Sequence, residues 1–103
     1  MRHVARYRFG REFKKLYGKL PPRKQAAVNE ALKRALADLD DPRLRLHALK
    51  GEFVGTYSLS AGGDLRIHLR LLEEMVDGET VLIASLQAVG THSQLYDWES
   101  AGS

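Results

Sequence analysis

The sequence contains no cysteine. Without thiols it can form no disulfide, carry no thiolate nucleophile and build no cysteine-ligated zinc site. It also lacks long apolar runs. No stretch approaches the roughly 20 residues that span a bilayer, and the N-terminal residues hold no apolar signal-peptide core. We therefore expect a cytoplasmic protein with no membrane partner.

Acidic residues are scarce in the first half of the chain. Residues 1–50 carry 14 Lys and Arg against five Asp and Glu, a net charge of +9, whereas residues 51–103 have a net charge of −6. This imbalance favours a polyanionic or acidic protein partner, although solubility alone also accounts for basic helix surfaces. The length predicts one domain over residues 1–98, followed by a disordered tail at 99–103.

The clearest periodicity lies in residues 64–72, where polar and apolar side chains alternate. Alternation with period two predicts a half-buried strand. The polar side of this strand is suited to an anion, but it is equally typical of the solvated outer face of an antiparallel sheet. The core side would carry Leu65, Ile67, Leu69 and Leu71, and the polar side Asp64, Arg66, His68 and Arg70.

Two amphipathic helices are predicted before that strand. Residues 10–20 show helical spacing and must end at Pro21-Pro22, where a second helix begins. The second helix stops before Asp40-Asp41-Pro42, and the short linker between the two predicts an αα-hairpin. The apolar stripe of the second helix would comprise Val28, Ala31, Leu32, Ala35, Leu36 and Leu39.

The remaining segments predict strands. Residues 3–9 are read as a first strand with Tyr7 and Phe9 inward, and residues 43–52 as a basic loop. Glycine-containing hairpin turns at 61–63 and 77–78 separate the later strands. Residues 80–89 are apolar on both faces, which favours a central strand. The predicted fold is α+β in the order β-α-α-β-β-β, with strands at 3–9, 53–59, 64–72 and 80–89 and the α-hairpin covering one face of a small, mainly antiparallel sheet.

Three polar groups stand at loops or strand ends: His47 with Lys50, Asp64 with its strand, and His92 with Tyr96. In a three-strand meander the entry of the first strand and the exit of the last can converge, so His47, Asp64 and His92 are expected to meet over one face. Other interpretations remain open. The histidines also fit ordinary surface positions, and Asp64 fits a turn cap. Zinc binding by the three histidines and Asp64 has no closely spaced ligand pair to support it.

Several of these residues carry a resemblance to a known family. The segments His47-Ala48-Leu49-Lys50-Gly51 and Gly90-Thr91-His92-Ser93-Gln94-Leu95-Tyr96, with Gly55 and Asp64 between them, resemble the RelE/ParE superfamily of bacterial and archaeal type II toxins. The YafQ-like mRNA interferases are the branch that the motifs resemble most. The resemblance implies an endoribonuclease without metal or cofactor, acting on mRNA at the ribosome. It also implies a cognate antitoxin partner, with DNA contacted only through that antitoxin.

The resemblance also implies roles for individual residues. The RNA 2′-hydroxyl would attack the adjacent phosphorus, which requires a base, an acid and cations near the phosphoryl oxygens. His47, Asp64 and His92 match positions that take part in proton transfer. Arg66 resembles a phosphate-binding strand arginine. The substrate-binding set comprises Lys50, Arg66, His68, Arg70 and Tyr96, with Tyr96 at an aromatic position near the substrate.

Two positions depart from the YafQ-like pattern. Ser60 stands where the pattern has a histidine, and Leu65 stands where it has a tryptophan. Loss of that histidine would lower activity, pass its role to His68, or indicate a non-nucleolytic relative. The alternatives are therefore a ParE-like toxin that binds DNA gyrase without catalysis, and an inactive RelE-like protein of a regulatory complex.

Overall fold

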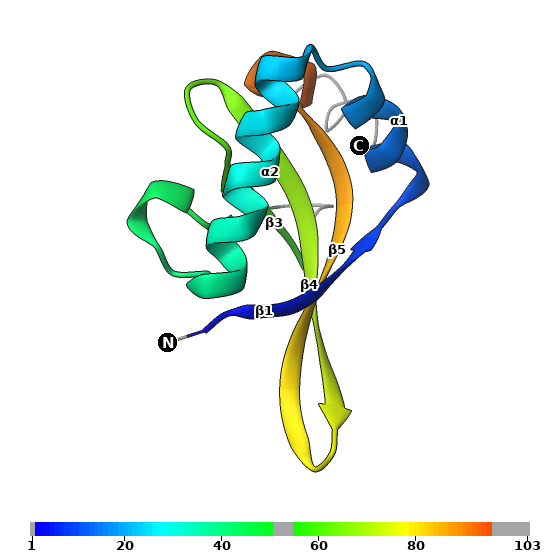
Figure 1. Ribbon diagram of the computed structural model, residues 1–103, viewed down its shortest axis with the longest axis vertical. Helices are drawn as coiled ribbons and strands as arrows, with labels where there is room; N and C mark the ends of the chain where they lie inside the picture. Colours follow the sequence, from blue (N-terminus) through cyan, green and yellow to red (C-terminus); the bar gives the residue numbers. More distant parts are fainter. Residues whose placement is uncertain (1, 51–54, 96–103) are drawn as a thin grey trace.

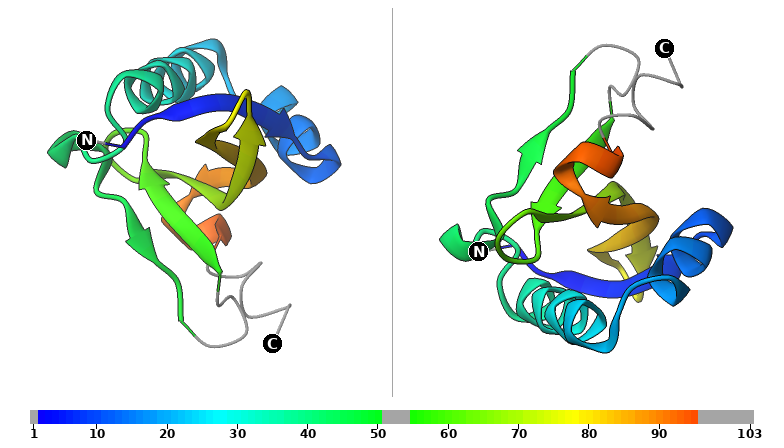
Figure 2. Two further views of the ribbon diagram at one scale, coloured as in Figure 1. Left: turned by 90° about the horizontal axis from the view of Figure 1, so that it is seen from below. Right: turned by 90° about the horizontal axis from the view of Figure 1, so that it is seen from above.

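The computed structural model describes residues 2–50 and 55–95. Its elements form a five-stranded sheet in the order β1-β5-β4-β3-β2, with both α-helices on one side of it (Figures 1 and 2). The α+β fold and the predicted element order are confirmed. The structure adds the short strand β2 and the 3₁₀ turn η1. The elements are β1 Val4–Phe9, α1 Arg11–Gly18, α2 Pro22–Ala37, η1 Pro42–Leu44, β2 His47–Ala48, β3 Thr56–Ser60, β4 Leu65–Val76 and β5 Glu79–Thr91.

Strand β1 pairs in parallel with β5, whereas all other pairs in the sheet are antiparallel. A parallel pair needs a long crossover, which the helices and the meander supply. At the end of β1 the N–H of Gly10 donates to the Leu86 carbonyl at 3.0 Å. A Cβ at Gly10 would lie 2.6 Å from that oxygen. Only glycine therefore lets the chain pass this close to β5 and turn into α1.

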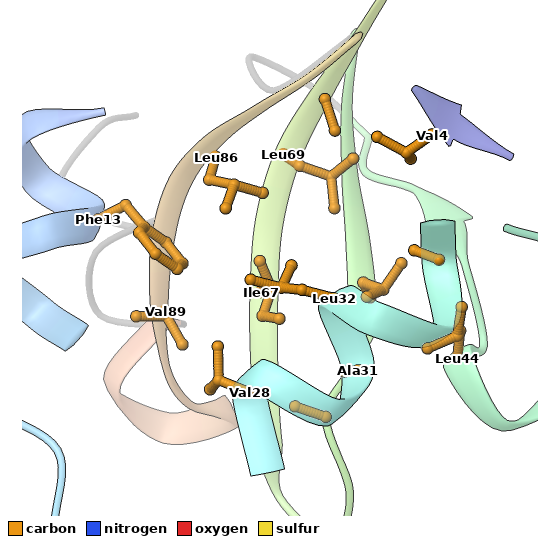
Figure 3. Packing of buried hydrophobic residues seen from close by; sticks show 14 of the residues in the cluster. Val4, Phe13, Val28, Ala31, Leu32, Leu44, Ile67, Leu69, Leu86 and Val89 are labelled. Carbon is orange, nitrogen blue, oxygen red and sulfur yellow. The ribbon is translucent and has the colours of Figure 1, made fainter. Parts of the chain in front are cut away.

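The helices bury one stripe each against the sheet (Figure 3). Phe13 of α1 and Val28 of α2 lie against Ile67, Leu86 and Val89 of the sheet. Full burial of one such aliphatic side chain contributes about 1.5–3 kcal/mol, so this layer holds the helices in place. The predicted α-hairpin is confirmed, and it is tied by two hydrogen bonds: Tyr17 Oη to Asn29 Oδ1 at 2.9 Å and Gln25 Nε2 to the Tyr17 carbonyl at 3.0 Å.

Two predicted core positions are wrong in part. Leu36 is 43% exposed, because it lies about 80° around the helix from Val28, outside the arc of roughly 100° that faces the sheet. Phe9 is 49% exposed. Its ring does lie on the predicted side, 6.0 Å from the ring of Phe13. Phe9 is the last residue of the edge strand β1, so about half of its side chain remains exposed to solvent.

The core side of β4 is as predicted. Leu65, Ile67 and Leu69 are buried, and Leu71 packs against the same cluster. The strand is longer than expected, because β4 and β5 continue past the helices as a two-stranded arm that turns at Asp77 and Gly78 (Figure 1). Across the described part of the chain, no helix combines the length and the apolar composition needed to cross a membrane.

Candidate active site

The register of the sheet places two of the histidines in one row. His47 of β2 lies opposite Ser58 of β3, and Ser58 lies opposite His68 of β4. Directly opposed residues project to the same side of a sheet. His47 and His68 therefore share a side, and two strand spacings of about 4.8 Å put their Cα atoms roughly 10 Å apart. This side is opposite to the one that Leu65, Ile67 and Leu69 present to the helices.

The ring of His47 is held in one orientation. Its Nδ1 lies 2.9 Å from the carbonyl oxygen of Arg45. A carbonyl can only accept a hydrogen bond, so Nδ1 carries the proton and Nε2 of the neutral ring is an acceptor. Arg45 itself has a left-handed backbone, with φ of 47°. That Arg45 positions this imidazole could not be predicted from the sequence.

His68 is a buried, neutral imidazole. Its side chain lies on the central strand of the meander and is 2% exposed. Its pKa is lowered to about 4, mainly by burial and to a smaller extent by the charges of His47 and His92. The solvated-face interpretation of this row is therefore wrong at His68. The electrostatic effects of His47 and His92 on His68 indicate that each of them lies near His68.

The exit of β5 is tied to the β3–β4 hairpin. The backbone N–H of His92 donates to the carbonyl of Asp64 at 2.9 Å. This bond continues the β4–β5 register beyond the pair Leu65–Thr91. His92 and Asp64 are thus neighbours in the main chain, as the sequence predicted, and both are exposed. In Figure 1 the hairpin and the turn after β5 lie at the same end of the sheet.

A capping box fixes the turn that begins at His92. The N–H of Gln94 donates to Thr91 Oγ1 at 3.3 Å, and the N–H of Thr91 donates to Gln94 Oε1 at 2.8 Å. These reciprocal bonds start the helical residues 92–95. The pattern Thr-x-x-Gln was visible in the sequence as a helix start, but the role of Gln94 was not recognised there.

Gly90 and Leu95 complete the motif. A Cβ at Gly90 would lie 2.8 Å from Gln94 Oε1, so glycine makes room for the folded-back amide. Leu95 is buried and anchors the turn to the protein. Gly90, Thr91 and Leu95 of this motif therefore each stabilise the turn, and together they fix the main-chain position of His92.

Arg66 stabilises the hairpin as well as facing the polar side. Its Nη1 donates to the Gly63 carbonyl at 2.9 Å, to the Leu65 carbonyl at 3.0 Å and to Ser60 Oγ at 3.4 Å. Ser60, at the position expected for a histidine, also accepts from the Gly62 N–H at 3.3 Å. Within residues 2–50 and 55–95 no carboxylate pairs with Arg66, so its positive charge is not neutralised there.

The other predicted contact residues differ in their surroundings. Arg70 is exposed between Thr56 of β3 and Ser85 of β5. Lys50 is exposed at the end of a described segment, and Tyr96 and the predicted tail lie outside the described residues. In the portion that the structure describes, no group of three or more His, Cys, Asp or Glu is placed to hold a metal ion.

The fold resembles that of solved toxins, although the sequence matches no family model and no curated protein. A YoeB/ParE toxin from Agrobacterium tumefaciens has a TM-score of 0.64 at 14% identity, over 84% of this chain and 98% of that one. YafQ from E. coli has a TM-score of 0.59 at 14% identity, over 93% and 99%. RelE, solved in a RelB–RelE antitoxin–toxin complex from Methanococcus jannaschii, has a TM-score of 0.52 at 15% identity, over 88% and 96%. The chain therefore has the RelE/ParE-type fold that its motifs predicted.

Proposed function

We propose that this protein is the toxin of a type II toxin–antitoxin pair and that it cleaves RNA without a metal ion. The observation that carries the proposal is that His47 and His92 each lie near His68, with Asp64 a main-chain neighbour of His92. His47 and His92 are exposed, and imidazole side chains suit proton transfer near neutral pH. The RelE-type fold supports the same class of activity.

In the proposed reaction the RNA 2′-oxygen attacks the adjacent phosphorus. A bond forms between O2′ and phosphorus while the bond to the 5′-oxygen breaks, which leaves a 2′,3′-cyclic phosphate and a 5′-hydroxyl. His47 takes the 2′-hydroxyl proton through Nε2, which the Arg45 carbonyl leaves as the acceptor. His92 delivers a proton to the departing oxygen. Asp64 orients His92 from the neighbouring main-chain position.

The cations of the same side would hold the phosphate. Arg66 and Arg70 project beside His68 on β4, and neither is paired with a carboxylate in the described residues. Fixed positive charge near the phosphoryl oxygens stabilises the charge that gathers there. His68 is buried and neutral, so it would act as a positioning residue that adds no charge between the two exposed imidazoles.

The expected partners are an antitoxin and translating mRNA. YafQ has been solved in a DinJ–YafQ toxin–antitoxin complex, and RelE in a RelB–RelE complex. A net charge of +9 over residues 1–50 is complementary to an acidic antitoxin segment. A substrate at the ribosome places the protein in the cytoplasm. DNA would be contacted only through the antitoxin.

A direct assay tests the activity. Purified protein with EDTA is incubated with RNA, both free and in translating ribosomes, and the fragment ends are identified. The proposal predicts cuts that leave a 2′,3′-cyclic phosphate, and intact RNA in both settings would contradict it. Ser60 at the histidine position favours the inactive regulatory alternative. That alternative predicts antitoxin binding with no cleavage, whereas the gyrase-binding alternative predicts inhibition of DNA supercoiling.

A further inference from the structure

A polar pocket of about 500 Å³ lies beside the candidate active site. It opens between the segment leading into β2 and the β3–β4 hairpin. This volume is within the range of small-ligand sites in proteins. Its lining residues are Pro42, Arg43, Arg45, Ser60, Gly62 and Gly63.

The pocket shares residues with the catalytic groups on both sides. Arg45 lines it and also orients His47 through its carbonyl. Ser60 and Gly63 line it and also accept hydrogen bonds from Arg66. Two of the walls are therefore hydrogen-bonded directly to His47 and to Arg66.

The two arginines that line the pocket differ in whether a carboxylate pairs with them. Arg43 is engaged by Asp41 at 2.8 Å. Arg45 has no carboxylate partner among the residues that the structure describes, and it is exposed. Its left-handed φ of 47° accompanies its position as the C-cap of η1, where its N–H donates to the Pro42 carbonyl.

The walls suit a flat ring. Gly62 and Gly63 have no side chains, so a planar group can lie against their backbone, and Pro42 supplies an apolar plate. We infer that this pocket binds the guanine base of the nucleotide next to the scissile phosphate, with the Arg45 guanidinium donating to O6 and N7. This inference rests on the proposed RNA substrate. The two parallel N–H donors of an arginine match the O6 and N7 acceptors of guanine. They match no other base as well.

Two variants distinguish hydrogen bonding to the guanine base from attraction by a positive charge alone. Arg45→Gly removes the guanidinium while glycine readily keeps the left-handed backbone that positions His47. Arg45→Lys keeps the charge but loses the two-donor fork. Arg23→Ala, an exposed arginine at the start of α2, is the matched control. We expect both Arg45 variants to lose about tenfold in preference for guanosine at the mapped cleavage sites, and the control to keep the wild-type preference.

Nucleotide binding provides a readout that does not depend on cleavage. The full chain is titrated with 5′-GMP and, separately, with 5′-CMP while the amide resonances of Gly62 and Gly63 are followed by NMR. Larger shifts with GMP in the wild type, lost in Arg45→Lys, support the pocket even if no RNA is cut, in which case only the nuclease proposal fails. Equal shifts with both nucleotides, or an unchanged cleavage preference in Arg45→Lys, overturn the inference while leaving the nuclease proposal intact.

Discussion

The backbone amide of His92 donates a hydrogen bond to the carbonyl oxygen of Asp64 at 2.9 Å. This single bond joins the exit of β5 to the hairpin between β3 and β4. It makes a histidine and an aspartate from distant parts of the sequence main-chain neighbours. Because both lie at the ends of paired strands rather than on a long loop, their main-chain positions are set by the sheet.

Gly90→Ala should destabilise the protein by about 1 kcal/mol, because the added Cβ displaces the Gln94 amide and breaks the hydrogen bond that it accepts from the Thr91 N–H. Urea unfolding of the variant and the wild type measures this difference. Gly18→Ala is the control, since a Cβ there meets nothing within 4 Å. Because Gly18 is the last residue of α1, we expect the control to keep the wild-type stability or to gain up to about 1 kcal/mol.

A double-mutant cycle identifies the cause. In a Gln94→Ala background the amide is already gone, so Gly90→Ala should cost clearly less than it does in the wild type. If the two substitutions are simply additive, the contact between Gly90 and Gln94 does not explain why glycine occupies this position.

His68 should make the protein sensitive to mild acid. Its pKa is lowered to about 4 in the folded state, whereas an unfolded histidine titrates near pH 6.5. Between these values the unfolded chain binds more protons, so stability falls as the pH falls through this window. At pH 5 the loss relative to pH 7.5 should be about 2 kcal/mol. Urea unfolding at both pH values measures this difference in unfolding free energy.

Two substitutions test that assignment. His68→Gln cannot titrate, so the difference in unfolding free energy between pH 7.5 and pH 5 should shrink by about 2 kcal/mol. His3→Gln, at an exposed position in front of β1, should leave the difference as in the wild type. An acid sensitivity that persists unchanged in His68→Gln would show that another group is responsible.

Arg66 and Arg70 form a matched pair on the same strand. Arg66→Met removes three hydrogen bonds to the hairpin and should cost about 1–2 kcal/mol in unfolding free energy. Arg70→Met should cost less than about 0.5 kcal/mol, because Arg70 is exposed. Both variants should bind RNA more weakly and with a reduced salt dependence. Equal stability of the two variants would contradict the structural role of Arg66.

Much of the fold could be predicted because local patterns agreed with tertiary structure. Alternation in residues 64–72 identified both the strand and its core side, and the paired glycines at Gly62 and Gly63 marked the hairpin. Strand β2 was missed, because two residues have no periodicity and only their pairing with β3 makes them a strand. The extension of β4 to Val76 was missed because Leu71-Leu72 and Glu73-Glu74 interrupt the alternation.

The site was predicted less completely than the fold. The motif located His92 and Asp64, and the hydrogen bond between their backbones follows from the strand register. The burial of His68 could not be predicted from the sequence, because Arg66 and Arg70 flank it on the same side of the strand and suggest an exposed position. Burial depends on what surrounds a strand in space. Arg45 was not recognised either, because its contribution to His47 comes from a backbone carbonyl and a left-handed φ.

The most direct test of the nuclease account compares the wild type with His92→Gln, which keeps a similar volume but cannot transfer a proton. Both proteins are purified, checked for equal stability, and incubated with translating ribosomes in the presence of EDTA. The account predicts RNA cleavage by the wild type and a rate at least about 100-fold lower for the variant. Cleavage by His92→Gln at the wild-type rate, or no cleavage by either protein, would contradict it.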